Sequence, residues 1–122
     1  MAGIIHSAYL SAMLHATLLP LVPALRAICR RLGVQQLYLF GSAVTNHFDS
    51  ARSDVDALVV LPPMPPLALG ETLLSLWFEL EALLQRRVDL LTSDSLQNPF
   101  LKIEIERTKQ LIYDATRTEV SV

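Results

Sequence analysis

The sequence predicts an α/β (α+β) fold, a small mixed β-sheet flanked by helices, and three observations support it. Segments with helical periodicity alternate with short apolar segments in the order α-β-β-α-β-α-β, which favours a mixed sheet. Apolar residues make up 52% and charged residues 18% of the chain, as in a folded globular protein. The length of 122 residues suits one domain. We therefore expect an N-terminal apolar helix over 1–20, the domain itself over 21–115 and a flexible tail over 116–122.

Two helices are expected before the first strand. Apolar side chains at helical spacing over 4–19 predict the first helix. Pro20 and Pro23 end or restart it, because proline is tolerated only in a first helical turn. The second helix is predicted over 22–32, and Gly33 stands where a helix C-cap glycine belongs.

Two strands follow, and a polar loop joins them. The segment 34–40 is rich in β-branched, aromatic and aliphatic residues, which predicts a strand. The segment 41–53 is polar and mixed, so we expect a loop with one helical turn. The segment 54–61 ends in a continuous apolar run, as expected for a strand buried on both faces.

The next segments predict a long helix and a third strand. Prolines make 62–66 a stiff connector. Helical periodicity over 67–85 predicts a helix, in which we expect Trp77 and Phe78 to lie in the core rather than to form a base-stacking platform. The segment 87–92 predicts a short strand.

A helix and a strand close the predicted domain. Asp94 or Ser95 can cap a last helix that runs to about Lys109, because short polar side chains accept hydrogen bonds from the free amides of a first helical turn. The segment 111–113 predicts a short closing strand.

Composition excludes several classes of function. A net charge of −2 lacks the basic footprint typical of nucleic-acid binding. One cysteine, Cys29, excludes an internal disulfide and a Cys-based zinc cluster, and it is consistent with a reducing compartment. The oily N-terminal segment is interrupted by His6, His15, Pro20 and Pro23, so it lacks the roughly 20 apolar residues of a spanning helix. We expect a cytoplasmic protein without membrane or direct nucleic-acid contacts, whose surplus apolar surface suits a homo-oligomer or another subunit contact.

A pair of carboxylates opens the second predicted strand. Asp54 and Asp56 are two residues apart, so in a strand they point to the same face. Two adjacent carboxylates repel each other unless a cation compensates, and Mg²⁺ prefers such hard oxygen ligands. Asp89 lies between apolar neighbours in the third predicted strand and can join the pair if the two strands are adjacent. Three carboxylates could then hold two Mg²⁺ ions, which activate an attacking oxygen and stabilise a leaving one.

Gly41 and Ser42 end the first predicted strand and can bind phosphate. Glycine lets the backbone approach an anion closely, and the following amides and hydroxyl are donors. Each feature alone also has a structural explanation: an Asp-x-Asp pair commonly lies in a solvated turn or caps a helix, and Asp89 could pair with Arg86 or Arg87. The ordered set of strand, Gly-Ser, loop, acid pair, helix and third acid favours phosphoryl or nucleotidyl transfer.

The same residues resemble the polymerase-β-like nucleotidyltransferase superfamily and, within it, the minimal nucleotidyltransferase (MNT) antitoxins. The resemblance covers about residues 24–115 and depends on a combination of motifs rather than on any single one. The matching segments are LYLFGSA (37–43) and SDVDALVV (53–60) for the family signature, RVDLL (87–91) for the strand of the third carboxylate, and NPFL (98–101) and LIYD (111–114) for the closing helix and tail.

This resemblance implies a polymerase-β-like fold and an enzyme that transfers a nucleoside monophosphate, AMP if the donor is ATP, with Mg²⁺ as cofactor and release of pyrophosphate. By the same resemblance, Gly41 and Ser42 hold the triphosphate. Asp54 and Asp56 bind the metal ions, and Asp89 completes the metal site or accepts the proton of the acceptor hydroxyl.

The sequence departs from the family pattern in the loop after the Gly-Ser pair. Eleven residues lie between Ser42 and Asp54, which is one more than is usual in the family. Thr45-Asn46 also stands where the family tends to carry Arg-Gly. Arg52 is a candidate substitute for nucleotide binding, because a guanidinium offers charged donors in a fork.

The resemblance also implies a partner. Small bacterial members of the family commonly act beside a helical HEPN (higher eukaryote and prokaryote nucleotide-binding) protein, as the antitoxin that transfers AMP onto a tyrosine of this toxin. Two alternatives remain open. One is a nucleotidyltransferase for a small molecule such as an aminoglycoside, and the other is a catalytically weak antitoxin that blocks its partner by contact alone.

Overall fold

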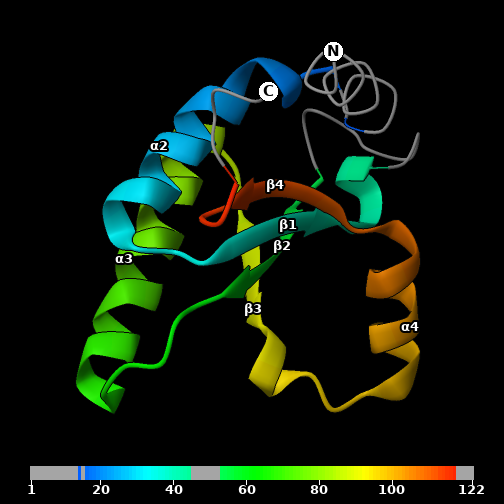
Figure 1. Ribbon diagram of the computed structural model, residues 1–122. Coiled ribbons are helices and arrows are strands. Elements are labelled where there is room, and N and C mark those ends of the chain that lie inside the picture. The colour runs from blue at the N-terminus through cyan, green and yellow to red at the C-terminus, as the bar shows by residue number, and fades with distance from the viewer. Residues whose placement is uncertain (1–13, 15, 45–52, 118–122) are drawn as a thin grey trace.

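A four-stranded mixed sheet lies at the centre of the computed structural model, which describes residues 14, 16–44 and 53–117 (Figure 1). The strand order is β3-β2-β1-β4. Strand β1 pairs antiparallel with β2 and with β4, whereas β2 and β3 are parallel. A parallel pair needs a crossover connection, and α3 supplies it. The elements are α2 (Val22–Leu32), β1 (Gln36–Phe40), β2 (Val55–Val60), α3 (Pro66–Leu84), β3 (Val88–Thr92), α4 (Pro99–Thr108) and β4 (Gln110–Asp114), with the short 3₁₀ helices η1 (Leu19–Leu21), η2 (Gly41–Val44) and η3 (Ser93–Ser95).

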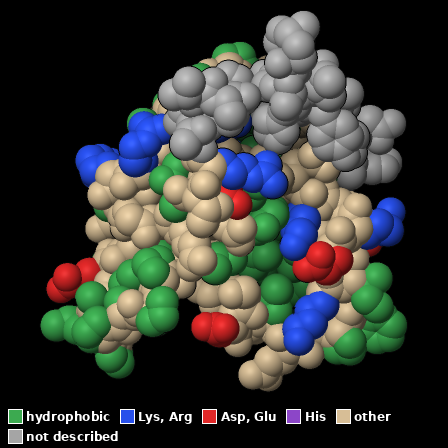
Figure 2. All heavy atoms as spheres, viewed as in Figure 1, with side chains coloured by type: hydrophobic (Ala, Val, Ile, Leu, Met, Phe, Trp, Pro, Cys, Tyr) green, Lys and Arg blue, Asp and Glu red, His purple; other side chains and the backbone are tan. Residues whose placement is uncertain are grey.

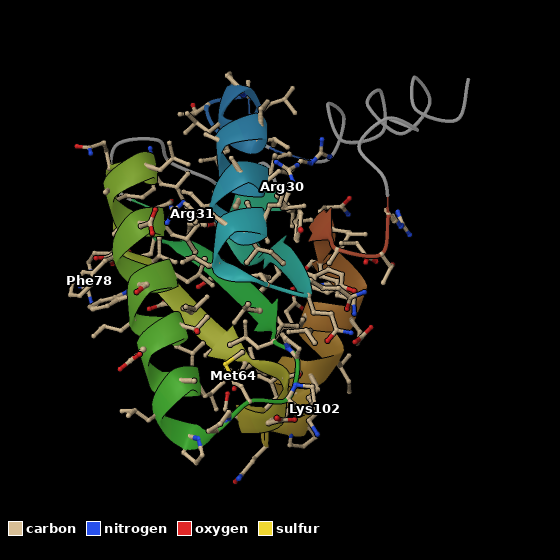
Figure 3. The ribbon with its side chains drawn as sticks, turned by 60° about the vertical axis from the view of Figure 1, so that its left-hand side comes forward. Arg30, Arg31, Met64, Phe78 and Lys102 are labelled. Carbon is tan, nitrogen blue, oxygen red and sulfur yellow. The ribbon has the colours of Figure 1, made fainter. Side chains whose placement is uncertain are left out.

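Helices α2 and α3 cover one face of the sheet (Figure 1) and form the main hydrophobic core with it. An ion pair between Arg31 of α2 and Glu79 of α3 joins the two helices at the surface (Figure 3). Helix α2 ends at Gly33 in the left-handed conformation, as predicted. The core side chains on this face include Leu25, Cys29, Leu37, Leu39, Val55, Ala57, Val59, Leu76, Leu80, Leu84, Val88 and Ile112.

Helix α4 covers the opposite face, where Ile105 packs against Phe40 and Leu58 in a second, smaller core. The helix begins later than the sequence predicted. Asn98 is its N-cap, and the Asn98 side chain accepts hydrogen bonds from the amides of Phe100 and Leu101. The prediction that Asp94 or Ser95 caps this helix is therefore wrong, because those residues belong to η3 and the proline after Asn98 is suited to a first helical position.

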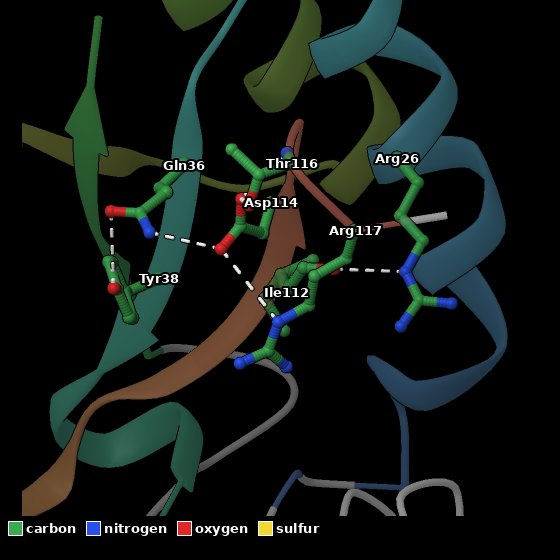
Figure 4. A network of polar contacts seen from close by, with 7 residues as sticks. All are labelled: Arg26, Gln36, Tyr38, Ile112, Asp114, Thr116 and Arg117. Atoms are coloured by element: carbon green, nitrogen blue, oxygen red, sulfur yellow. Dashed lines mark hydrogen bonds and ion pairs between the residues drawn. The ribbon is translucent and has the colours of Figure 1, made fainter. Parts of the chain in front are cut away.

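Strand β4 is fastened to β1 and α2 by a polar network (Figure 4). The carboxylate of Asp114 accepts hydrogen bonds from Nε2 of Gln36 at 3.1 Å and from the amide and hydroxyl of Thr116. The bonds from Thr116 and then Gln36 hold the pKa of Asp114 below its usual value. On the other side of the strand, Nε of Arg26 donates to the carbonyl of Ile112 at 2.9 Å.

Large apolar side chains also lie on the surface of α3 and α4. Figure 2 shows apolar surface at the lower left and the lower right, where Figure 1 places these two helices. Trp77 and Phe78 are 36% and 58% exposed, and Phe78 points away from the sheet (Figure 3). The prediction that both belong to the core is wrong. Only the stripe of Leu76, Leu80 and Leu84 is buried against the sheet, because one helix face can contact it.

The predicted N-terminal helix over 1–20 falls mainly on residues outside those that the structure describes. The described part of this segment has turns at 16–18 followed by η1. Residues 118–122 of the predicted tail also lie outside the described residues. No helix among the described residues is long and apolar enough to cross a membrane.

Candidate active site

Two of the three predicted carboxylates lie opposite each other. The parallel register of β2 and β3 places Asp56 beside Asp89, at the beginning of both strands. Because the side chains of a strand alternate between its faces, Asp56 shares a face with Leu58, which is the face that α4 covers. Asp54 immediately precedes β2. The condition under which Asp89 can join the other two acids, that their strands are neighbours, is therefore met.

The carboxylate of Asp56 is in an unfavourable electrostatic environment. Burial raises the pKa of Asp56 to about 6, and the charge of Asp89, a hydrogen bond with Asp89 and the charge of Asp54 act in the same direction. Asp56 is half-buried, whereas Asp89 is exposed. A cation bound at this pair would relieve the repulsion that raises the pKa.

Gly41 brings the backbone against this carboxylate. It directly follows β1, whose last residue, Phe40, is the register partner of Asp56. Gly41 has a φ of +70°, and a Cβ built on it would lie 2.5 Å from Oδ2 of Asp56. Position 41 therefore requires glycine for two reasons. Its backbone is left-handed, and there is no room for a side chain beside Asp56.

Ser42 follows in the same short helix, η2, and is half-buried. The helical turn predicted in the 41–53 loop is thus present at its beginning. Arg52, the predicted substitute for the missing arginine, lies outside the described residues.

The donor set suits a divalent cation. Mg²⁺ commonly uses one or two protein carboxylates and completes its octahedron with water and phosphate oxygens. Asp56 and Asp89 supply such carboxylates, and their mutual repulsion favours a cation between them. In the described part of the chain, no group of three or more His, Cys, Asp or Glu side chains is gathered so that it could hold a metal ion. Coordination by all three acids therefore stays a prediction, with Asp56 and Asp89 at its centre.

Two further residues hold the strand of Asp89, and the sequence analysis did not identify them. Nε1 of Trp77 donates to the carbonyl of Val88 at 3.0 Å, and Oε2 of Glu81 accepts from the amide of Val88 at 2.8 Å. The sequence contains one sign of this role, the spacing of four residues between Trp77 and Glu81. On one helix this spacing places the indole donor and the carboxylate acceptor on the same face.

An acid pair on parallel strands with a glycine turn against it suits the nucleotidyl transfer that the sequence predicts. The family model of the Nucleotidyltransferase domain matches residues 23–112. The chain belongs to this family and is a nucleotidyltransferase. No curated protein matches the sequence.

Solved structures agree with this assignment. A minimal nucleotidyltransferase is 30% identical over 77% of this chain and 91% of its own length, with a TM-score of 0.61. A toxin–antitoxin complex with AMP-PNP is 22% identical over 78% of this chain and 74% of the other, with a TM-score of 0.58. The MNT antitoxin in complex with a tri-AMPylated HEPN toxin of Shewanella oneidensis is 22% identical over 77% and 70%, with a TM-score of 0.52. The predicted polymerase-β-like nucleotidyltransferase fold is confirmed, and the chain shares this fold with the solved MNT antitoxins.

Proposed function

We propose that this nucleotidyltransferase uses Mg²⁺ to transfer AMP from ATP onto a tyrosine hydroxyl of a HEPN-type toxin, and thereby acts as its antitoxin. The observation that carries the chemistry is the pairing of Asp56 with Asp89 across β2 and β3, with Gly41 packed against Asp56. The proposal for the donor and the partner is supported by the likeness to the AMP-PNP complex and to the complex with an AMPylated toxin.

Each residue has a role that its position suits. The amides and hydroxyl of the turn at Gly41 and Ser42 bind the triphosphate. Asp56 and Asp89, with Asp54 beside them, hold the divalent cation, which when bound polarises phosphate oxygens and neutralises their charge. Asp89 is exposed, so it is accessible to an incoming hydroxyl.

The reaction balances without another reagent. The acceptor oxygen forms a bond to the α-phosphorus of ATP, and the bond from that phosphorus to the oxygen bridging to the β-phosphate breaks. Pyrophosphate leaves with the bonding electron pair, and Asp89 accepts the proton of the hydroxyl. The attacking and leaving oxygens must be held in line with the phosphorus, so orientation of the acceptor is a large part of catalysis.

Exposed apolar side chains provide a surface on which a protein acceptor could dock. Leu67 of α3 and Phe100 of α4 are 76% and 80% exposed. Exposed apolar side chains can take part in a contact with another protein, so they suit a protein acceptor.

The decisive experiment is intact-mass measurement of a co-expressed HEPN-type partner. With the wild-type chain, the partner should gain the mass of one or a few AMP units, and with Asp56→Asn it should gain none. Asp94→Asn, an exposed acid of η3, is the matched control and should leave the modification intact.

Other outcomes would contradict the proposal in different ways. A tight complex with an unmodified partner would favour neutralisation by contact alone. Modification of an added aminoglycoside, without modification of the partner, would favour the small-molecule alternative.

A further inference from the structure

Strand β3 carries Asp89 at the edge of the sheet, where it has a neighbouring strand on one side only. In a parallel pair, alternate residues direct their N–H and C=O groups away from the partner strand. The carbonyl of Arg87 accepts from the amide of Val55 at 3.0 Å, so it points inward. The backbone groups of Val88, the next residue, consequently point to the open edge.

Both of these outward groups are bonded to side chains of α3. The amide of Val88 donates to Oε2 of Glu81 at 2.8 Å, and its carbonyl accepts from Nε1 of Trp77 at 3.0 Å. Trp77 and Glu81 lie one helical turn apart on α3. Together they make the two hydrogen bonds to Val88 that a neighbouring strand would otherwise make. We call this pair of bonds the edge clamp.

The clamp lies directly before Asp89. The carbonyl that Trp77 holds belongs to the same peptide unit as the amide of Asp89, so the clamp fixes the backbone from which this side chain projects. An edge strand is held by a neighbouring strand on one side only. Repulsion from the negative charges of Asp54 and Asp56 acts to push Asp89 outward. Mg²⁺ requires nearly ideal octahedral geometry, which a displaced carboxylate does not provide.

We propose that Trp77 and Glu81 are positioning residues that hold Asp89 beside Asp56 in the geometry a divalent cation needs. The metal-binding part of this inference rests on the proposed function, whereas the clamp itself belongs to the metal-free fold. Both residues act through the backbone of Val88, to which their side chains are bonded.

Three variants of the full chain test the clamp. Trp77→Phe keeps an aromatic ring and removes the donor, and Glu81→Leu keeps the bulk and removes the acceptor. Glu81→Gln retains an acceptor oxygen and should restore wild-type behaviour. Glu71→Leu is the control, because it makes the same substitution at an exposed position nearer the beginning of α3.

The first measurement is amide exchange of Val88 by NMR, without metal or nucleotide. Exchange should rise by about tenfold in Glu81→Leu, as expected when one hydrogen bond is lost. It should stay at the wild-type rate in Glu81→Gln and Glu71→Leu. Unchanged exchange in Glu81→Leu would show that the clamp does not hold the edge.

The second measurement is the affinity for Mn²⁺, used as a spectroscopic probe for the divalent site. Binding should weaken by about tenfold in Trp77→Phe and Glu81→Leu, again the scale of one hydrogen bond, and Glu81→Gln should bind normally. Wild-type affinity in both clamp variants, or an equal loss in Glu81→Gln, would overturn the inference.

A wild-type chain that binds no Mn²⁺ would instead contradict the proposed function. The clamp is then judged by nuclear Overhauser contacts between Asp56 and Asp89, measured without metal. These contacts should be present in the wild type and weaker in both clamp variants. Their persistence in both variants would overturn the positioning role.

Discussion

The Cα of Gly41 faces the carboxylate of Asp56 so closely that a Cβ at position 41 would lie 2.5 Å from Oδ2. Gly33 offers a natural comparison, since it has nearly the same φ, +73° against +70°, but has no atom within 4 Å of a built Cβ. Substitutions at the two glycines therefore separate two costs in free energy. One is the cost of a left-handed backbone, and the other is the cost of a collision between the new Cβ and the Asp56 carboxylate.

Gly41→Ala should therefore lose both stability and nucleotide binding, whereas Gly33→Ala should lose stability alone. The left-handed backbone costs roughly 1–2 kcal/mol for a residue with a Cβ. In Gly41→Ala the Asp56 side chain must also move. Urea unfolding and calorimetry with Mg-ATP measure the two effects, and equal affinity in both variants would contradict a role for the close approach.

The second prediction concerns pH. The folded state raises the pKa of Asp56 from 3.8 to about 6, so it binds this proton more tightly than the unfolded state does. The stabilisation from Asp56 is then fully present below pH 3.8 and is lost as the pH rises through about 6.

The difference between wild type and Asp56→Asn isolates this effect from the other acids. Urea unfolding without metal should show that the free energy of unfolding of the wild type falls relative to the variant between about pH 4 and pH 6. Parallel curves for the two proteins would contradict the raised pKa. A saturating divalent cation should reduce the difference, because it favours the ionised carboxylate.

The third prediction is that ATP binding requires a divalent metal, because the clustered carboxylates would otherwise repel the triphosphate. Calorimetry should detect binding with Mg²⁺ and much weaker binding in EDTA. A ligand stabilises the fold that binds it, so Mg-ATP should raise the melting temperature more than Mg²⁺ or ATP alone. Equal affinity in the two conditions would exclude a metal-bridged site.

The fourth prediction separates the roles of the three acids. Asp54→Asn and Asp56→Asn should abolish transfer and leave the fold intact, because asparagine keeps the shape and removes the charge. Asp89→Asn should lower the rate strongly with a smaller effect on nucleotide binding, as expected for a carboxylate that also accepts the proton of the acceptor hydroxyl. A labelled-ATP transfer assay measures the rates, and wild-type rates in all three variants would refute the assignment.

Local patterns in the sequence were sufficient to predict the type and approximate position of the four strands and of α2, α3 and α4. Short apolar segments correspond to β1, β2, β3 and β4, and the C-cap glycine marked the end of α2. The sequence could place Asp89 beside Asp56 only on the condition that their strands are neighbours. Strand adjacency is set by long-range packing, which the period of one segment does not contain.

The features that the sequence did not predict depend on contacts between segments that are distant in the chain. Trp77 fits an apolar helical pattern, yet its indole N–H needs a partner, and the edge of β3 provides one. Asn98 rather than Asp94 caps α4, and the proline that follows Asn98 suits a first helical position. The close approach of Gly41 to Asp56 requires the register between β1 and β2, which no single segment specifies.

The crossover through α3 has a consequence for how the protein is made. Asp56 and Asp89 become neighbours only after α3 has closed the loop between two parallel strands, and such distant pairings form late because the chain must first lose loop entropy. The turn at Gly41 meets Asp56 when β1 pairs with β2, whereas Asp89 joins them only when β3 pairs with β2. Pairing of Asp56 with Asp89 therefore reports that the β2-α3-β3 unit has closed.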